Sequence, residues 1–126
     1  MYLDVDVIYS LLKENDFNRG YAEKVLQAKG KKYTSVVSLL ELEIVVKREL
    51  GDALSLETSQ LARKAVPELQ VLELSQRDFE KSLELRKRHG LGIFDALHAA
   101  VCIENDGIMA STDQAFERVK NLKRFT

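Results

Sequence analysis

The chain has 126 residues, 45% of them hydrophobic and 31% charged, and its 19 basic and 20 acidic side chains give a net charge of −1. This length and apolar content predict a single folded domain over residues 1–126 and exclude a disordered chain. The charge balance provides no overall positive field, so a bound polyanion would have to be held by a local patch or a bound cation.

The only cysteine, Cys102, excludes an internal disulfide and argues against a cysteine-based zinc site. Asp4 and Asp6 interrupt the apolar N-terminus, which argues against a signal peptide. No apolar run approaches the ~18 residues that a membrane span needs. We therefore expect a soluble, cytoplasmic protein with no membrane partner.

The hydrophobic pattern alternates between the periods of strands and helices. Gly30, Gly51 and Gly90 follow three of the predicted helices, and Ser75 with Asp78 predicts a capping box at the start of another. In chain order we predict a strand at 2–5, helices at 7–13 and 16–29, a strand at 33–36, helices at 37–50 and 55–65, a strand at 70–74, helices at 76–89 and 94–104, a strand at 108–110, a short helix at 114–119 and a strand at 123–125.

This alternation predicts an α/β fold: a three-layer α/β/α sandwich around a mostly parallel sheet of about five strands. In such sheets, ligands bind at the carboxyl ends of the strands, near the point where the strand order reverses. We therefore look for chemistry among the residues that follow the predicted strands.

Two acidic residues lie in apolar surroundings. Asp4 falls inside the predicted first strand, where a carboxylate is costly unless it is paired or metal-bound. Asp6, two residues on, has an ordinary role available as a helix N-cap. Glu41 lies in a helix that is apolar almost all round, which we expect to be buried. Glu43 can pair with Lys47 one turn later, whereas Glu41 has no cation within helical reach.

Each remaining acidic residue also has a purely structural role available. Glu41 could lie at an exposed edge of its helix. Asp95 could favour the dipole of the helix that it opens, and Asp113, after the strand at 108–110, could be an N-cap. His98, one turn after Asp95, is expected to be packed and not to bind a ligand directly.

Taken together, Asp4, Glu41, Asp95 and Asp113 could converge at one edge of the sheet. Two carboxylates about 5 Å apart repel each other by roughly 3 kcal/mol at an effective dielectric of ~20, so a cluster of four would take up protons or bind cations. Oxygen ligands without a His or Cys cluster suit Mg²⁺ or Mn²⁺.

Four segments of the chain resemble, in order, the motifs of PIN-domain nucleases, and among them the VapC-type toxins of toxin–antitoxin pairs. They are residues 3–8 (LDVDVI), 34–42 (TSVVSLLEL), 94–100 (FDALHAA) and 111–116 (STDQAF). Many relatives carry Asn, Ser or Thr where this chain has Asp6. Many also carry an acidic residue where it has Ala115, so the number of metal ions stays open.

The resemblance implies a Mg²⁺- or Mn²⁺-dependent ribonuclease in which Asp4, Glu41, Asp95 and Asp113 hold the metal and carry the catalysis. It places Asp6, Ser35, Thr112 and His98 in supporting positions. It also implies a homodimer and a small antitoxin partner. Lys47 and Arg48 are candidates for binding the phosphates of RNA, and Lys29, Lys31 and Lys32 are expected to be solvated surface. The apolar residues Leu54, Leu56, Leu61 and Ala65 could form a partner surface.

Three other functions fit parts of the sequence. Asp4-Val5-Asp6 matches the D-x-D signature of haloacid-dehalogenase-like phosphatases, which would make Asp4 a nucleophile. A phosphoacceptor receiver domain has a similar size but needs an aspartate after the third strand, where this chain reads Glu73-Leu74-Ser75. The third is a PIN-fold module that binds or processes RNA with weak or no catalysis, for which Ala115 is the hint.

Overall fold

The computed structural model describes all 126 residues, and its centre is a sheet of five parallel strands in the order β3-β2-β1-β4-β5. Tyr2 of the central strand pairs with Tyr33 on one side and with Met109 on the other. The strands are β1 (Tyr2–Leu3), β2 (Tyr33–Ser35), β3 (Gln70–Leu72), β4 (Ile108–Ala110) and β5 (Lys123–Arg124). The strand order reverses between β1 and β4, which marks this edge as the expected ligand site.

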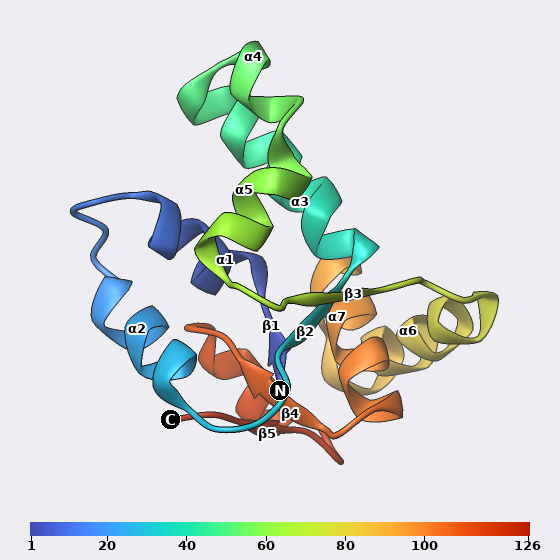
Figure 1. Cartoon of the computed structure of the whole chain (residues 1–126). Coiled ribbons are helices and arrows are strands. Elements are labelled where there is room, and N and C mark those ends of the chain that lie inside the picture. Colours follow the sequence, from blue (N-terminus) through green and yellow to red (C-terminus); the bar gives the residue numbers. More distant parts are fainter.

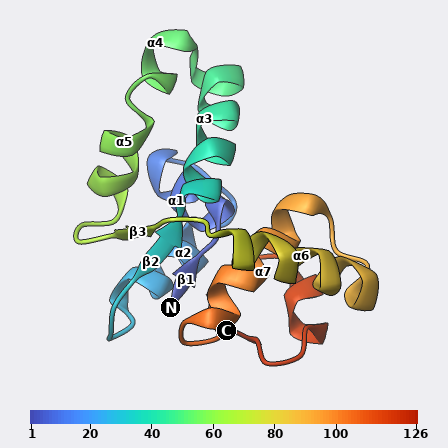
Figure 2. The ribbon, with the colours of Figure 1, turned by 90° about the vertical axis from the view of Figure 1, so that its right-hand side faces the viewer.

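Helices cover both faces of the sheet (Figure 1). They are α1 (Val5–Leu12), α2 (Arg19–Gln27), α3 (Val36–Leu50), α4 (Asp52–Ser55), α5 (Thr58–Ala65), α6 (Gln76–His89) and α7 (Ile93–Glu104), followed by the 3₁₀ helix η1 (Gln114–Arg118). The views in Figures 1 and 2 agree that α3, α4 and α5 extend away from the sheet. No helix is long and apolar enough to cross a membrane.

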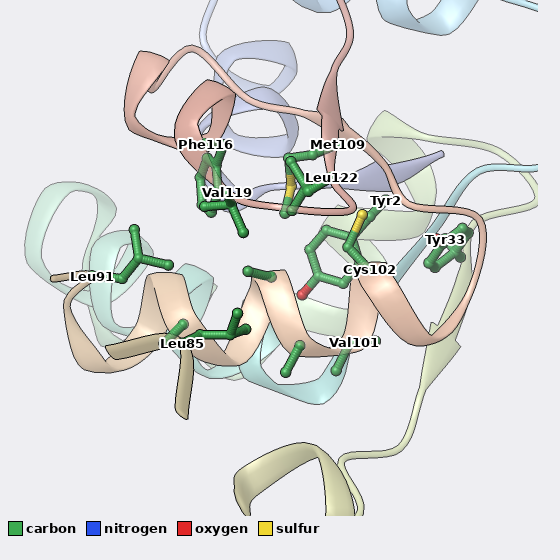
Figure 3. Close-up of a cluster of buried hydrophobic side chains, with 13 residues drawn as sticks. Tyr2, Tyr33, Leu85, Leu91, Val101, Cys102, Met109, Phe116, Val119 and Leu122 are labelled. Atoms are coloured by element: carbon green, nitrogen blue, oxygen red, sulfur yellow. The ribbon is translucent and has the colours of Figure 1, made fainter. Parts of the chain in front are cut away.

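Two hydrophobic cores lie on opposite faces of the sheet, because neighbouring residues of a strand point to opposite sides. Tyr2 and Met109 contribute to the core under α6, α7 and η1, part of which Figure 3 shows. Leu3 and Ala110, the next residues of the same strands, contribute to the core under α1, α2, α3 and α5. The predicted α/β/α sandwich with five strands is confirmed.

The element order is as predicted, and most bounds agree within three residues. The capping box of Ser75 and Asp78 is present, and Gly90 ends α6 with a positive φ of 66°. The single helix predicted at 55–65 is wrong in its first turn: α4 and α5 are separate. Ser55 Oγ donates to the carbonyl of Asp52 at 2.7 Å and Thr58 Oγ1 to that of Ser55 at 2.6 Å. Such side-chain bonds compete with helix continuation.

The expectation that α3 is buried all round is also wrong. Leu42 and Val46 are fully buried, but Val36, Leu40 and Ile44 are each about half exposed. These three residues, four positions apart, form a continuous line on one face of the helix, here named the α3 stripe. Val36 and Leu40 line an open groove whose other side is formed by Leu56 and the first turn of α5, so this face of α3 is left uncovered.

Candidate acidic site

Five acidic residues and His98 gather at the carboxyl ends of the central strands, and this group is here named the acidic site: Asp4, Glu41 and Asp95 act on His98, and Asp6 and Asp113 act on these carboxylates. Asp4 and Asp6 follow β1, Glu41 comes from α3, Asp95 from the first turn of α7, and Asp113 follows β4. These residues come from segments up to about a hundred positions apart in the sequence. The reversal of strand order between β1 and β4 is what brings the ends of β1 and β4 together.

Asp4 is the most buried carboxylate of the acidic site, with 6% of its surface exposed. The strand ends at Leu3, so Asp4 lies after it and caps α1: Oδ1 accepts from the Val5 N–H at 2.8 Å. This corrects the expectation that Asp4 lies inside the strand with no local role. Its Oδ2 accepts from Ser111 Oγ at 2.7 Å.

Burial raises the pKa of Asp4 to about 6; the charge of Asp6 adds to this effect, while His98 and the hydrogen bond from Ser111 oppose it. Ionisation of this carboxyl group is therefore unfavourable in the folded chain. Positive charge nearby would favour the ionised form.

Asp6 lies in the first turn of α1 and is not an N-cap, so that alternative is wrong. Its Oδ2 accepts from the Thr112 backbone N–H at 2.9 Å and from the Thr112 hydroxyl. Its Oδ1 is buried without any hydrogen-bond partner. A buried carboxylate oxygen that lacks a donor is costly and suits a bound cation. Thr112 thus supports the site through Asp6.

His98 is the most buried member of the acidic site, and its Nε2 faces two carboxylates. Nε2 is hydrogen-bonded to Glu41 Oε1 and lies 3.7 Å from Asp4 Oδ1. The expectation that His98 is merely packed is therefore wrong. Glu41 is half-buried and does not point to solvent at an exposed edge of α3, so that alternative is wrong too.

Burial disfavours the charged imidazolium, but the hydrogen bond to Glu41 and the negative charges of Asp4 and Asp95 outweigh it and raise the pKa of His98. When protonated, His98 therefore interacts with both Glu41 of α3 and Asp4, which follows β1. This histidine links two carboxylates that come from different elements.

Asp95 and Asp113 lie at the open side of the site. Burial raises the pKa of the half-buried Asp95, and the negative charges of Asp113, Glu41 and Asp6 raise it further, while His98 lowers it. Asp113 is exposed and caps η1, since Oδ1 accepts from the Ala115 N–H at 2.8 Å. The capping role considered for Asp113 is thus correct, and its charge still acts on Asp95.

The remaining predicted residues lie outside the cluster of carboxylates. Ser35 is buried behind His98 and contacts Tyr2, at 2.8 Å between the two hydroxyl oxygens. Lys47 and Arg48 are exposed in the last turn of α3, and Arg48 Nε pairs with Glu49 at 3.1 Å. Neither cation contacts the acidic site. Glu43 is exposed and forms no ion pair with Lys47.

Sequence analysis missed two residues that hold the site together, Ser111 and Tyr2. Ser111 directly follows a predicted strand, and its position beside Asp4 could have been inferred from the pairing of β1 with β4. Tyr2 gave no signal in the sequence because aromatic residues are common in strands. Its contact with His98 depends on how α7 packs against the sheet.

The carboxylates do not form a ready-made metal site: no three Asp, Glu, His or Cys side chains have a ligating arrangement. The donor set nevertheless fits a hard cation, because it consists of carboxylate oxygens and includes the unpartnered Asp6 Oδ1. Glu41 and Asp95 are half-buried and Asp113 is exposed, so this group of oxygens is partly open to solvent.

Comparisons with known proteins agree with the fold and with the resemblance to PIN domains. A family profile described as "PIN domain" matches residues 1–122, which confirms the resemblance. No curated protein sequence matches the chain.

Three solved structures illustrate the likeness. VapC20 from Mycobacterium tuberculosis, described as a Sarcin-Ricin loop cleaving toxin, has a TM-score of 0.74 at 19% identity over 89% of this chain and 88% of that one. FitAcB from Neisseria gonorrhoeae has 0.75 at 18% identity over 99% and 96%. VapBC2 from Rickettsia felis, bound to a DNA fragment from its promoter, has 0.73 at 18% identity over 98% and 96%. At these identities the likeness shows a shared fold.

Proposed function

Because the chain belongs to the PIN domain family, we propose that it is a divalent-metal-dependent ribonuclease of the VapC toxin type, which hydrolyses RNA phosphodiester bonds at the acidic site. The observation that carries the proposal is the gathering of five acidic side chains from four parts of the chain, of which Asp4, Glu41 and Asp95 act on one buried histidine. A stable fold gains nothing from such a concentration of negative charge unless a cation binds there.

Asp4, Glu41, Asp95 and Asp113 would hold the cation, either Mg²⁺ or Mn²⁺, with Asp6 as a further oxygen donor. When bound, a divalent cation polarises a phosphate oxygen and lowers the pKa of water so that hydroxide attacks phosphorus. The chain's own residues fix the carboxylates: Ser111 and the α1 N-terminus hold Asp4, Thr112 holds Asp6, and His98 holds Glu41.

The carboxylates also make the binding of RNA dependent on the cation. Without a cation, their negative charges repel the phosphate backbone, so binding of substrate requires the cation. Ribonucleic acid is the preferred substrate because one protein of the same fold is described as cleaving the Sarcin-Ricin loop. Attack by water makes no use of the ribose 2′-OH, so the mechanism by itself does not distinguish RNA from DNA.

Arg48 is the better candidate of the two predicted phosphate-binding residues. It follows Glu41 by seven residues, which is about two helical turns, so both lie on the same face of α3. Lys47 lies roughly 100° away around the helix from Arg48. We expect Arg48→Gln to weaken RNA binding and Lys47→Gln to change it less.

The proposal is tested by incubating purified protein with structured RNA in the presence of Mg²⁺ or EDTA. Cleavage is expected with Mg²⁺, is abolished by EDTA, and falls about 100-fold or more in Asp95→Asn. The matched control is Asp52→Asn, an exposed acidic position in α4, which should keep full activity. Cleavage that survives EDTA, or that Asp95→Asn leaves intact, contradicts the proposal.

We also propose that the chain has a small antitoxin as a partner. The antitoxin docks in a largely apolar groove between α1 and α2 on one side and α3, α4 and α5 on the other. The groove has a volume of about 490 Å³. Its lining is mostly apolar (Leu11, Leu12, Leu26, Leu50, Leu54, Leu61 and Ala65) and also includes the charged residues Arg19, Glu23 and Lys64. An amphipathic helix is the kind of segment that fits such a groove. Solved structures of this fold include toxin–antitoxin complexes, which supports the choice of partner.

The homodimer belongs to the proposal too, but on a different surface. Leu56 is 81% exposed and lies beside a second groove that includes Val36 and Leu40 of the α3 stripe. The predicted partner surface of Leu54, Leu56, Leu61 and Ala65 is therefore divided between two faces. We assign the first groove, between α1, α2 and α3 to α5, to the antitoxin. We assign the α3 stripe and Leu56 to self-association.

A second candidate function is a PIN-fold module that binds RNA with weak or no catalysis. The observation that favours it is the hydrogen bond between His98 and Glu41, which engages one carboxylate that a cation would need. Ala115, at a position where an acidic residue is common in the family, points the same way. The cleavage experiment separates the two candidates.

The other two alternatives are not supported. The strand order differs from the 2-1-3-4-5 order of receiver domains, and the family match leaves no support for a phosphatase.

A further inference from the structure

A buried group of hydroxyls lies behind His98, on the side away from the carboxylates. The Tyr2 hydroxyl oxygen is 2.6 Å from His98 Nδ1, 2.8 Å from Ser35 Oγ and 3.2 Å from Ser38 Oγ. All four residues are buried. Figure 3 shows the Tyr2 ring within the core, with its hydroxyl oxygen directed at α7. This polar group therefore has no contact with solvent.

When His98 is neutral, the partners of its two ring nitrogens indicate which nitrogen carries the proton. Nε2 faces carboxylate oxygens of Glu41 and Asp4, which only accept, so Nε2 must carry the proton. Nδ1 must then accept; the Tyr2 hydroxyl, at 2.6 Å, is the closest donor to it, and Ser38 Oγ lies farther away at 3.4 Å. The Tyr2 oxygen can in turn accept from Ser35 and Ser38, which satisfies every member of the group.

We propose that Tyr2 is a positioning residue: its hydroxyl donates to Nδ1 and so strengthens the Nε2–H tautomer, in which His98 directs this N–H at Glu41 and Asp4. This inference rests on the proposed function in one respect, that Glu41 is a cation ligand. The hydrogen bond from His98 engages Glu41 Oε1 and leaves Oε2 as the free oxygen. Partners behind a ligand fix its orientation in many metal sites.

Loss of the Tyr2 hydroxyl removes one of the two sets of contacts that favour this tautomer, the other being the carboxylates at Nε2, and leaves Ser38 Oγ, 3.4 Å away, as the remaining partner of Nδ1. With the proton on Nδ1, the lone pair of Nε2 would face two carboxylates, and Glu41 would lose its hydrogen bond. The side chain of Glu41 would then leave its present place, and a cation would have to order it again. We expect the dissociation constant for Mg²⁺ to rise by about tenfold.

The variant that tests this is Tyr2→Phe, which removes only the hydroxyl. Tyr33→Phe is a matched control, because Tyr33 lies on the neighbouring strand with its ring 5.7 Å from that of Tyr2, but its hydroxyl contacts Asp106 and not His98. The chain has only two histidines, His89 and His98, so ¹⁵N NMR of the imidazole rings resolves His98.

At a pH where the imidazole is neutral, the wild type and Tyr33→Phe should show the Nε2–H tautomer of His98, and Tyr2→Phe should shift it toward Nδ1–H. Calorimetric titration with Mg²⁺ should show weaker binding in Tyr2→Phe alone. An Nδ1–H tautomer in the wild type overturns the inference without any variant, and so does equal Mg²⁺ affinity in the wild type and Tyr2→Phe.

The two proposals fail in different ways. If the wild type neither binds Mg²⁺ nor cleaves RNA, but Tyr2→Phe shifts the tautomer of His98 and Tyr33→Phe does not, the proposed function fails and the role of Tyr2 in orienting His98 stands. If the wild type binds Mg²⁺ and cleaves RNA while the tautomer does not respond to Tyr2→Phe, the proposed function stands and the inference fails.

Discussion

Glu41 and Glu43 lie two positions apart on α3 in different surroundings. Glu41 is half-buried and bonded to His98, whereas Glu43 is exposed. We predict that Glu41→Gln lowers metal-dependent cleavage by about 100-fold or more and that Glu43→Gln leaves it unchanged. Initial cleavage rates of the two variants at equal protein concentration decide the matter. Equal losses in both would show that the wrong carboxylate was chosen.

The pH dependence of stability follows from Asp4 and His98. The folded chain raises the pKa of Asp4 from 3.8 to about 6, so folding binds protons in this range and stability falls as the pH rises through it. The raised pKa of His98 acts in the same direction. Its contribution to the free energy of unfolding is fully present below about pH 6.5, the ordinary pKa of histidine, and is lost as the pH rises through the higher pKa of His98 in the folded chain. The raised pKa of Asp95 also has this sign.

We therefore predict that the metal-free protein loses roughly 1 to 3 kcal/mol of unfolding free energy between about pH 5 and about pH 8. Urea unfolding in EDTA measures this. Asp4→Asn keeps a side-chain acceptor for the α1 N-terminus and should reduce the loss. A wild-type stability that rises over this range would contradict the assignment of a carboxylate whose ionisation is unfavourable in the folded chain.

At the scale of elements, the sequence predicted helix bounds correctly where the signal came from residues close together in the chain. The Ser75–Asp78 capping box and Gly90 fix the bounds of α6 through contacts within one turn. The exposed α3 stripe could not be predicted, because the apolar pattern of α3 does not say which of its faces another element covers. The bond between Glu41 and His98 was missed for a related reason, as it joins residues 57 positions apart.

The α3 stripe leads to a prediction about self-association. We expect the protein to form a dimer that Ile44→Glu disrupts, because the substitution places a charge in an apolar interface. Leu83→Glu on α6 is a matched control, since Leu83 is similarly exposed on another face of the molecule. Light scattering across a range of concentrations measures the mass. A strictly monomeric wild type at high concentration would refute this assignment.

At the scale of the whole molecule, the acidic site is a product of topology. The sequence supplied the acidic residues and the alternation of strands and helices, which was enough to expect carboxylates at one edge of the sheet. The support from Ser111, His98 and Tyr2 arises only when β1, β4 and α7 are assembled. The metal-binding role of Asp4, Glu41, Asp95 and Asp113 stays a prediction.

This concentration of charge predicts that cations stabilise the fold. Binding to the folded state alone, at 100 times the dissociation constant, adds about 2.7 kcal/mol, which corresponds to a rise in Tm on the order of 10 °C. Thermal unfolding in saturating Mg²⁺ is compared with EDTA at matched ionic strength. An unchanged Tm would argue against a shared cation site.

The most direct test of the proposed cation site is the anomalous diffraction of crystals soaked in Mn²⁺. We predict an anomalous peak enclosed by the carboxylates of Asp4, Glu41, Asp95 and Asp113, at the carboxyl ends of β1 and β4. A strong peak at a different place, with these four side chains left apart, would contradict the proposal.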